Sequence, residues 1–269
     1  MHTTRTEGKL DEALALYRRA LAAKPDLFEA QLSAGIALDL KGDYAEARKH
    51  LTRAIEVAPD QGRDLALAAV GVSYAFQARA RDAAIYCQQL FDRQMAGQNL
   101  SEAAATANAL GRVYLESGDL ANAQRWYQTG YETARRQPTL EGPDLDLWQM
   151  RWEHAQGRIA ARRGNLVSAR AHLAALKAII DNGGPNLDQM PIYWYLAGYL
   201  ALSARAYDEA VSDLLQADQK DPFILALLAQ AYEGAGDMPR RHRSITRRCS
   251  PRARTTSRTH SHGRSRSAS

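Results

Sequence analysis

The sequence has few of the residues that mark a secreted or membrane-spanning protein. Among its 269 residues there are two cysteines, Cys87 and Cys249, and their spacing fits no metal site or redox motif. They suggest no disulfide framework, so we expect a reducing, cytoplasmic compartment. The most apolar stretches, 193–204 and 223–232, are too short to cross a bilayer, and Met1–Leu10 lacks the apolar core of a signal peptide. We therefore expect a soluble chain with no membrane partner.

Catalytic motifs are also missing from the sequence. It contains no phosphate-binding glycine loop, no paired-histidine zinc helix and no nucleophile elbow. The paired carboxylates, such as Asp11–Glu12 and Asp208–Glu209, stand where helices are expected to begin, and there they favour the positive end of the helix dipole. We expect no enzymatic activity, no cofactor and no metal; an enzyme would need a catalytic domain upstream.

The amino-acid composition favours helix, and the charged residues are unevenly distributed along the chain. Ala and Leu dominate the body while Val, Ile and Thr are sparse there, and Ala and Leu lose little side-chain freedom in a helix. The net charge of +5 arises at one end, because 239–269 holds 10 Arg and no Lys, Asp or Glu. Residues 1–238 hold 25 basic against 30 acidic residues, so the folded body is acidic.

An internal repeat organises the first part of the chain. Four residues recur 34 positions later: Gly8, Ala13, Ala20 and Pro25 become Gly42, Ala47, Ala54 and Pro59. Glycine ends a helix because left-handed backbone costs it little, small alanines let two helices approach closely, and proline stops the second helix. The pattern predicts pairs of antiparallel helices.

These residues resemble the tetratricopeptide repeat, a two-helix unit with glycine and an aromatic in its first helix and Ala, an aromatic, Ala and Pro in its second. Looser copies follow, carried by Gly71, Tyr74 and Ala83; by Gly111, Tyr114, Gly118, Ala123 and Tyr127; by Gly157, Gly164, Ala169 and Leu173; by Trp194, Ala197, Gly198, Tyr207, Ala210, Leu214, Ala217 and Pro222; and by Tyr232 and Gly236. Wider spacing in these copies predicts longer helices or turns, notably at 138–143 and 182–185. The resemblance covers about residues 8–237.

The resemblance implies an all-α fold. We expect a right-handed α-solenoid of stacked antiparallel helix hairpins over residues 1–238, with about five full units and a half-unit at each end. A repeat cannot bury its apolar face alone, so half-repeats at both ends lead us to expect a fragment of a longer chain. The Arg- and Ala-rich usage favours a high-GC, bacterial genome.

Residues 239–269 form an Arg/Ser-rich segment that we expect to be disordered. Three interpretations stay open: a segment that binds RNA or another polyanion, a solvated tail without a role, and the product of a frameshift. The abrupt change in composition favours the frameshift. Shifted codons also permit alanine at Arg241 and tyrosine at Ile245, where the repeat would place them. Nucleic acid is a partner only if this tail is genuine.

In the family, the first helix of each unit lines a concave groove. The second and third units would place mostly apolar residues there, namely Glu29, Leu32, Ile36 and Asp39, then Leu65, Ala68, Val72 and Phe76. Such a surface suits an amphipathic helix or an extended peptide. The fourth, fifth and sixth units supply the candidate partner-binding residues: Asn108 and Arg112, then Arg151, His154, Arg158 and Arg162, then Tyr195 and Tyr199.

The four candidates of the fifth unit recur at three- and four-residue steps and therefore share one helical face. Guanidinium groups on one face can bind carboxylates bidentately, which suggests a ridge for an acidic peptide. The alternative is a solvated face paired with nearby Glu and Asp. Tyr195 and Tyr199 either anchor a partner or, the favoured interpretation, pack between helices.

These patterns predict a protein–protein interaction scaffold that holds a peptide or partner helix in the groove. Its partner would be another protein or peptide, acidic where it meets the ridge, and no small-molecule substrate is evident. Two alternatives stay open. One is a nucleic-acid-associated protein that uses the basic tail, and the other is the regulatory repeat region of a larger signalling enzyme.

Overall fold

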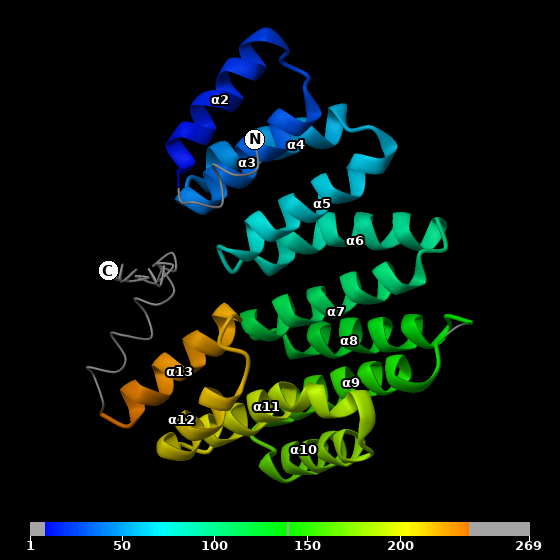
Figure 1. The fold of residues 1–269 in the computed structure, drawn as a ribbon, viewed down its shortest axis with the longest axis vertical. Helices are drawn as coiled ribbons and strands as arrows, with labels where there is room; N and C mark the ends of the chain where they lie inside the picture. Colours follow the sequence, from blue (N-terminus) through cyan, green and yellow to red (C-terminus); the bar gives the residue numbers. More distant parts are fainter. Residues whose placement is uncertain (1–8, 139, 237–269) are drawn as a thin grey trace, which may run out of the picture.

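The computed structural model describes residues 9–138 and 140–236, and all regular elements in those ranges are helical (Figure 1). In chain order they are α2 (Leu10–Ala23), α3 (Phe28–Lys41), α4 (Tyr44–Val57), α5 (Asp60–Ala75), α6 (Ala80–Ala96), α7 (Leu100–Ser117), α8 (Leu120–Arg135), α9 (Gly142–Arg162), α10 (Leu166–Asp181), the 3-10 helix η1 (Gly184–Gln189), α11 (Met190–Ser203), α12 (Tyr207–Gln216) and α13 (Pro222–Gly234). The predicted all-α fold is confirmed.

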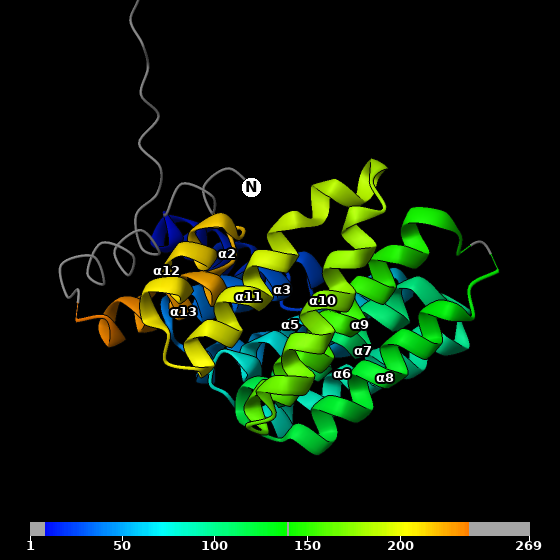
Figure 2. The same ribbon diagram turned by 90° about the horizontal axis from the view of Figure 1, so that it is seen from below.

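The helices form five antiparallel hairpins, α3/α4, α5/α6, α7/α8, α9/α10 and α11/α12, and each hairpin packs on the next. At the two ends of the described array, α2 packs on α3 and α13 packs on α12. Figure 1 shows the hairpins stacked along the long axis, and Figure 2 shows the stack from below. The architecture is an α-solenoid of five hairpins with a single helix at either end, as the sequence predicted.

The turns within hairpins explain the glycine signal. Gly42 and Gly118 follow α3 and α7 with φ angles of +84° and +86°, in the left-handed region that glycine enters without steric cost. The next helix is then capped, for example by Asp119, whose carboxylate accepts from the backbone N–H of Asn122 at 3.1 Å. The α5/α6 turn has Ala78 at a φ of +55° instead, so a left-handed residue occurs in this turn without glycine.

Close approach of paired helices explains the remaining signals. In three hairpins a large side chain of the second helix lies directly over a glycine sixteen residues earlier in the first helix: Leu51 over Gly35, Tyr127 over Gly111 and Leu214 over Gly198. The signature alanines of the second helices are fully buried: Ala47, Ala83, Ala123, Ala169 and Ala210. Since interiors are close-packed, these small residues set the distance between the helices.

The later units are lengthened, as their spacing predicted. Helix α9 has 21 residues and begins at Gly142, just after the 136–141 connection. The second insertion is η1, between α10 and α11. Asn186 of η1 is buried, and its Nδ2 donates to a carboxylate oxygen of Asp146 in α9 at 2.6 Å. This bond ties the inserted loop to the helix beneath it.

We predict that Gly198→Ala destabilises the array. A Cβ at Gly198 would lie 2.6 Å from Cγ of the fully buried Leu214 and 3.1 Å from its backbone nitrogen. Overpacking costs about 1–3 kcal/mol, whereas exchanging glycine for alanine inside a helix adds about 1 kcal/mol of stability. Thermal unfolding followed by circular dichroism should show a lower Tm. Gly97→Ala is the control, because its Cβ would meet only ordinary contacts; an equal loss there would contradict the explanation.

Candidate functional site

The C-terminal half of the groove-lining surface centres on Arg158 of α9. The Arg158 side chain is 3% exposed and donates to the hydroxyl oxygens of Tyr127 at 2.6 Å and Tyr195 at 3.1 Å. It also forms an ion pair with Glu116 of α7 at 3.4 Å. The guanidinium group is therefore held inside the protein by groups from α7, α8 and α11.

The electrostatics of this cluster favour a fixed positive charge at Arg158. Burial alone would lower the pKa of Arg158, but its interactions with Tyr127, Tyr195 and Glu116 outweigh burial and raise that pKa. Burial raises the pKa of Tyr127 to about 12, so the phenol is neutral near pH 7. Burial, together with the neighbouring arginines, holds the pKa of His154 well below its usual range, so the imidazole is neutral as well.

Arg112 joins α7 to the beginning of α13. Its guanidinium forms a 3.0 Å ion pair with Asp221, donates weakly to the Tyr195 hydroxyl at 3.4 Å, and lies 3.9 Å from the centre of the Phe223 ring. Arg112 and Asp221 are 109 residues apart in the sequence. The array therefore curls until α13 returns to α7, and this contact closes the C-terminal half of the groove (Figure 1).

The structure brings most of the predicted site residues together, but it does not leave them open. Arg158, Tyr195 and Tyr199 are buried. The expectation of a surface ridge is therefore wrong for Arg158, because its Nη atoms bond to groups on three neighbouring helices. His154 packs against the Tyr195 ring with 4.7 Å between ring centroids. The buried tyrosines agree with the packing interpretation.

The other candidates differ in accessibility. Arg162 is exposed and donates to the Leu115 carbonyl at 2.8 Å, so it caps the C-terminal end of α7. Arg151 lies 4.7 Å from the centre of the Trp148 ring, and burial lowers its pKa. Asn108 is half-buried. A role for these residues in partner binding stays a prediction.

The N-terminal half of the same surface is open and apolar. Leu65 and Val72 of α5 and Phe76, which directly follows α5, are 57%, 49% and 54% exposed, and their spacing places them on one helical face. On α3, Leu40 is 56% exposed, whereas Asp39, which the sequence placed in the groove, is buried. Leu32, also expected in the groove, is buried in the same helix. These two residues belong to the core between hairpins.

The burial of Asp39 has a clear structural reason. Its carboxylate accepts a hydrogen bond from Ser73 Oγ of the next unit at 2.8 Å. Burial raises the pKa of Asp39, although the bond from Ser73 opposes that shift. The pair is a polar link between α3 and α5 rather than a contact for a partner.

Beside Leu65, a shallow cavity of about 800 Å³ opens between α5, α6 and α7. Leu65, Ala68 and Leu90 contribute apolar lining, and Glu102 and Thr106 of α7 contribute polar lining. An ion pair of 2.7 Å between Arg93 and Asp64 also lies in this lining. The open apolar stripe of α5 therefore continues into a hollow.

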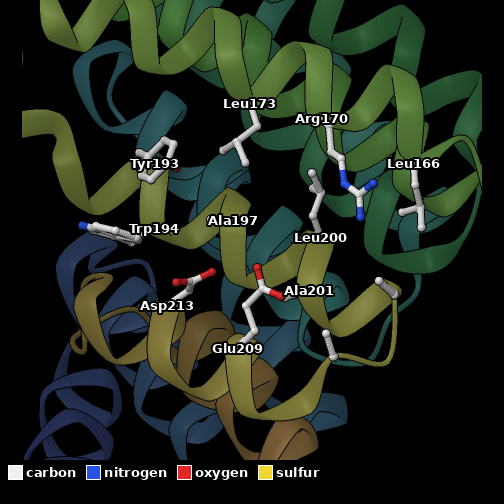
Figure 3. Close-up of a pocket in the computed structure, with 12 residues that line it drawn as sticks. Leu166, Arg170, Leu173, Tyr193, Trp194, Ala197, Leu200, Ala201, Glu209 and Asp213 are labelled. Atoms are coloured by element: carbon white, nitrogen blue, oxygen red, sulfur yellow. The ribbon is translucent and has the colours of Figure 1, made fainter.

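A second cavity, of about 320 Å³, lies between α10, α11 and α12 (Figure 3). Its lining comes from three helices: Leu166, Arg170 and Leu173 of α10, Tyr193, Trp194, Ala197, Leu200 and Ala201 of α11, and Glu209 and Asp213 of α12, with Ala204 and Ala206 between the last two helices. Sequence reasoning did not predict this cavity, because Glu209 stands where a carboxylate at the start of a helix is expected and most of the lining comes from other helices.

Other kinds of site find no support in the described part of the chain. Residues 9–138 and 140–236 contain no group of three or more His, Cys, Asp or Glu that could hold a metal ion. In the same ranges no helix is both long and apolar enough to span a membrane. Burial raises the pKa of Cys87 to about 11, which makes it a poor nucleophile at neutral pH. The tail at 239–269 lies outside the described residues.

We predict that Arg158→Met strongly destabilises the protein. The substitution would leave the hydroxyls of Tyr127 and Tyr195 and the carboxylate of Glu116 without their shared donor. Removing one partner of a buried charged pair typically costs about 3–5 kcal/mol. Urea unfolding should show the loss as a lower midpoint. Arg163→Met, at an exposed position of the same helix end, should change stability little; equal effects would show that Arg158 is not a structural centre.

Comparison with known proteins shows what this chain is similar to. Residues 5–62 match the tetratricopeptide repeat model. No curated protein sequence matches this chain. Among solved structures, a tetratricopeptide repeat protein from Parabacteroides merdae ATCC 43184 is 13% identical, with a TM-score of 0.59, and the match covers 91% of this chain and 88% of that one.

Two further structures are similar. BtubC (BKLC) from P. vanneervenii is 15% identical with a TM-score of 0.50, and 98% of each chain is covered. A chain of the APC/C hetero-tetramer Cut9–Hcn1 is 14% identical with a TM-score of 0.50; the match covers 90% of this chain but 44% of that one. This chain thus spans less than half the length of that relative. Residues 5–62 match the repeat sequence and 91% of the chain shares the fold of a solved tetratricopeptide repeat protein, so this chain is similar to such proteins in both respects.

Proposed function

We propose that this protein is an interaction scaffold that holds a peptide or partner helix on the open half of its concave surface. The observation that carries the proposal is the exposed stripe of Leu65 and Val72 on α5 and Phe76 at its C-terminal end. Tetratricopeptide arrays are in general scaffolds for other proteins. The stripe favours the α3–α5–α7 region as the docking surface, because it presents large apolar side chains where the array is not closed.

The energetics favour an apolar partner face at this surface. Fully burying a side chain the size of Leu, Val or Phe contributes about 1.5–3 kcal/mol. Three such side chains on one helical face can therefore supply the few strong contacts that dominate most interfaces. An amphipathic helix with apolar residues every three or four positions would match the spacing on α5.

The predicted site residues take two different parts in this proposal. Arg158, Tyr195 and Tyr199 support the curvature of the array from inside. Asn108, Arg112, Arg151 and Arg162 are the residues by which an acidic partner segment would extend along the C-terminal half, whereas His154 is neutral and packs against the Tyr195 ring. Arg112 is already paired with Asp221, so a partner gains most at the apolar half.

The proposal also covers the organisation of the chain. We place the repeat array at 1–238, separate from the basic segment 239–269, and we assign no catalytic role to the array. A cytoplasmic location accords with the two cysteines, which have no disulfide pattern.

Selection of displayed random peptides on the purified full chain tests this function. Selected peptides should carry apolar residues at helical spacing. Leu65→Asp and Val72→Asp should weaken their binding by about tenfold or more, which corresponds to losing roughly 1.4 kcal/mol of apolar contact. Val167→Asp is the matched control, since Val167 is 82% exposed on α10, away from α5.

Unchanged binding of the selected peptides in both α5 variants would contradict the assigned surface. Equal weakening by Val167→Asp would show a general charge effect instead. Circular dichroism of each variant should give an unchanged Tm, because all three positions are exposed.

A further inference from the structure

The cavity between α10, α11 and α12 has an unusual division of charge. Glu209 and Asp213 lie one turn apart on α12, and Figure 3 shows both carboxylates directed into the cavity. Among the described residues, neither carboxylate forms a hydrogen bond or an ion pair. Arg170 on the facing α10 is exposed and remains unpaired with them. The α12 side of the cavity therefore presents two negative charges that lack a neutralising partner.

Placing these two carboxylates together is unfavourable for the protein alone. Like charges four residues apart on a helix repel each other and destabilise the helix. Burial, and secondly the charge of Glu209, raise the pKa of Asp213. A cation bound between the two groups would relieve the repulsion and replace part of the lost solvation.

The rest of the cavity lining indicates which chemical group should carry such a cation. Ala197, Leu200 and Ala201 of α11 form an apolar floor, and Tyr193 and Trp194 bring aromatic rings to one end of it (Figure 3). A floor without hydrogen-bonding side chains can recognise only an apolar stem. The volume of about 320 Å³ lies at the lower end of the range for ligand pockets, about 300–1,000 Å³.

We propose that this cavity receives an arginine side chain of a partner protein, with its aliphatic stem on Ala197 and Leu200 and its guanidinium group between Glu209 and Asp213. Arginine fits better than lysine, because its planar group can bond two carboxylates at once and stack on an aromatic ring such as Trp194. The site lies on a different set of helices from the α5 stripe, so it is a second contact that goes beyond the proposed function.

The test measures binding of a single side chain to the intact chain. N-acetyl-arginine methylamide is titrated into the labelled protein while the indole N–H signal of Trp194, identified with Trp194→Phe, is followed by NMR. We expect a saturable shift of this signal. N-acetyl-lysine methylamide should give a weaker shift, and the norleucine analogue, which keeps the stem and lacks the charge, should give none.

Substitutions then assign the shift to the carboxylates. The double variant Glu209→Gln/Asp213→Asn should weaken binding by about tenfold or more, equivalent to roughly 1.4 kcal/mol. Arg170→Ala should strengthen binding, because it removes a like charge from the facing wall. Asp208→Asn is the matched control, an exposed carboxylate of the same helix outside the cavity lining, and it should leave binding unchanged.

Several results would overturn the proposal. These are no saturable shift, an equal shift with norleucine, or a shift that persists in the double variant. A short peptide with a central arginine should bind at least as tightly as the single-residue amide. If the peptide does not bind, the cavity does not receive an arginine of a partner protein. The Tm of the double variant should not fall, since the substitutions remove repulsion. Val72→Asp should leave the shift intact, so the two proposals can fail separately.

Discussion

The array depends on close contact between the two helices of each hairpin. Leu51 over Gly35 and Leu214 over Gly198 show the same arrangement: a large side chain of the second helix fills the space that a glycine leaves in the first. A hairpin held this closely still exposes an apolar face, and only the neighbouring hairpin can bury it. Stacking, curvature and the surfaces left open all follow from repeating this contact with small variations.

The two halves of the concave surface differ in the residues that they place at the groove positions. In the first half the groove positions are apolar and solvent-exposed, as at Val72. In the second half they are polar and paired mainly within the array, because the Nη atoms of Arg158 and Arg112 meet tyrosine hydroxyls and carboxylates of other units. Moving the helices apart would leave the buried guanidinium group of Arg158 without its charged and polar partners, so these helices have little freedom to separate. One half thus offers a surface, and the other sets the shape that presents it.

The sequence was sufficient for the hairpins because their signals are local. A glycine that ends a helix and an alanine that fits beneath another helix are encoded within one repeat, so even the lengthened fifth unit was anticipated. Helical spacing also placed Arg151 and Arg158 on a common face. Spacing could not show what lies opposite that face, since the partners of Arg158 come from 31 to 42 residues away. The cavity beside Trp194 could not be predicted from the sequence for the same reason, since its walls come from three helices.

The ion pair between Arg112 and Asp221 gives the molecule a property that a simple stack lacks. In a linear array each unit contacts only its neighbours, so either end can fray without disturbing the middle. Here a contact between residues 109 positions apart joins α7 to α13. The segment from α7 to α13 is thereby closed into a loop, and opening at α13 is coupled to α7. We therefore expect this half to unfold more cooperatively than a linear stack of the same length would.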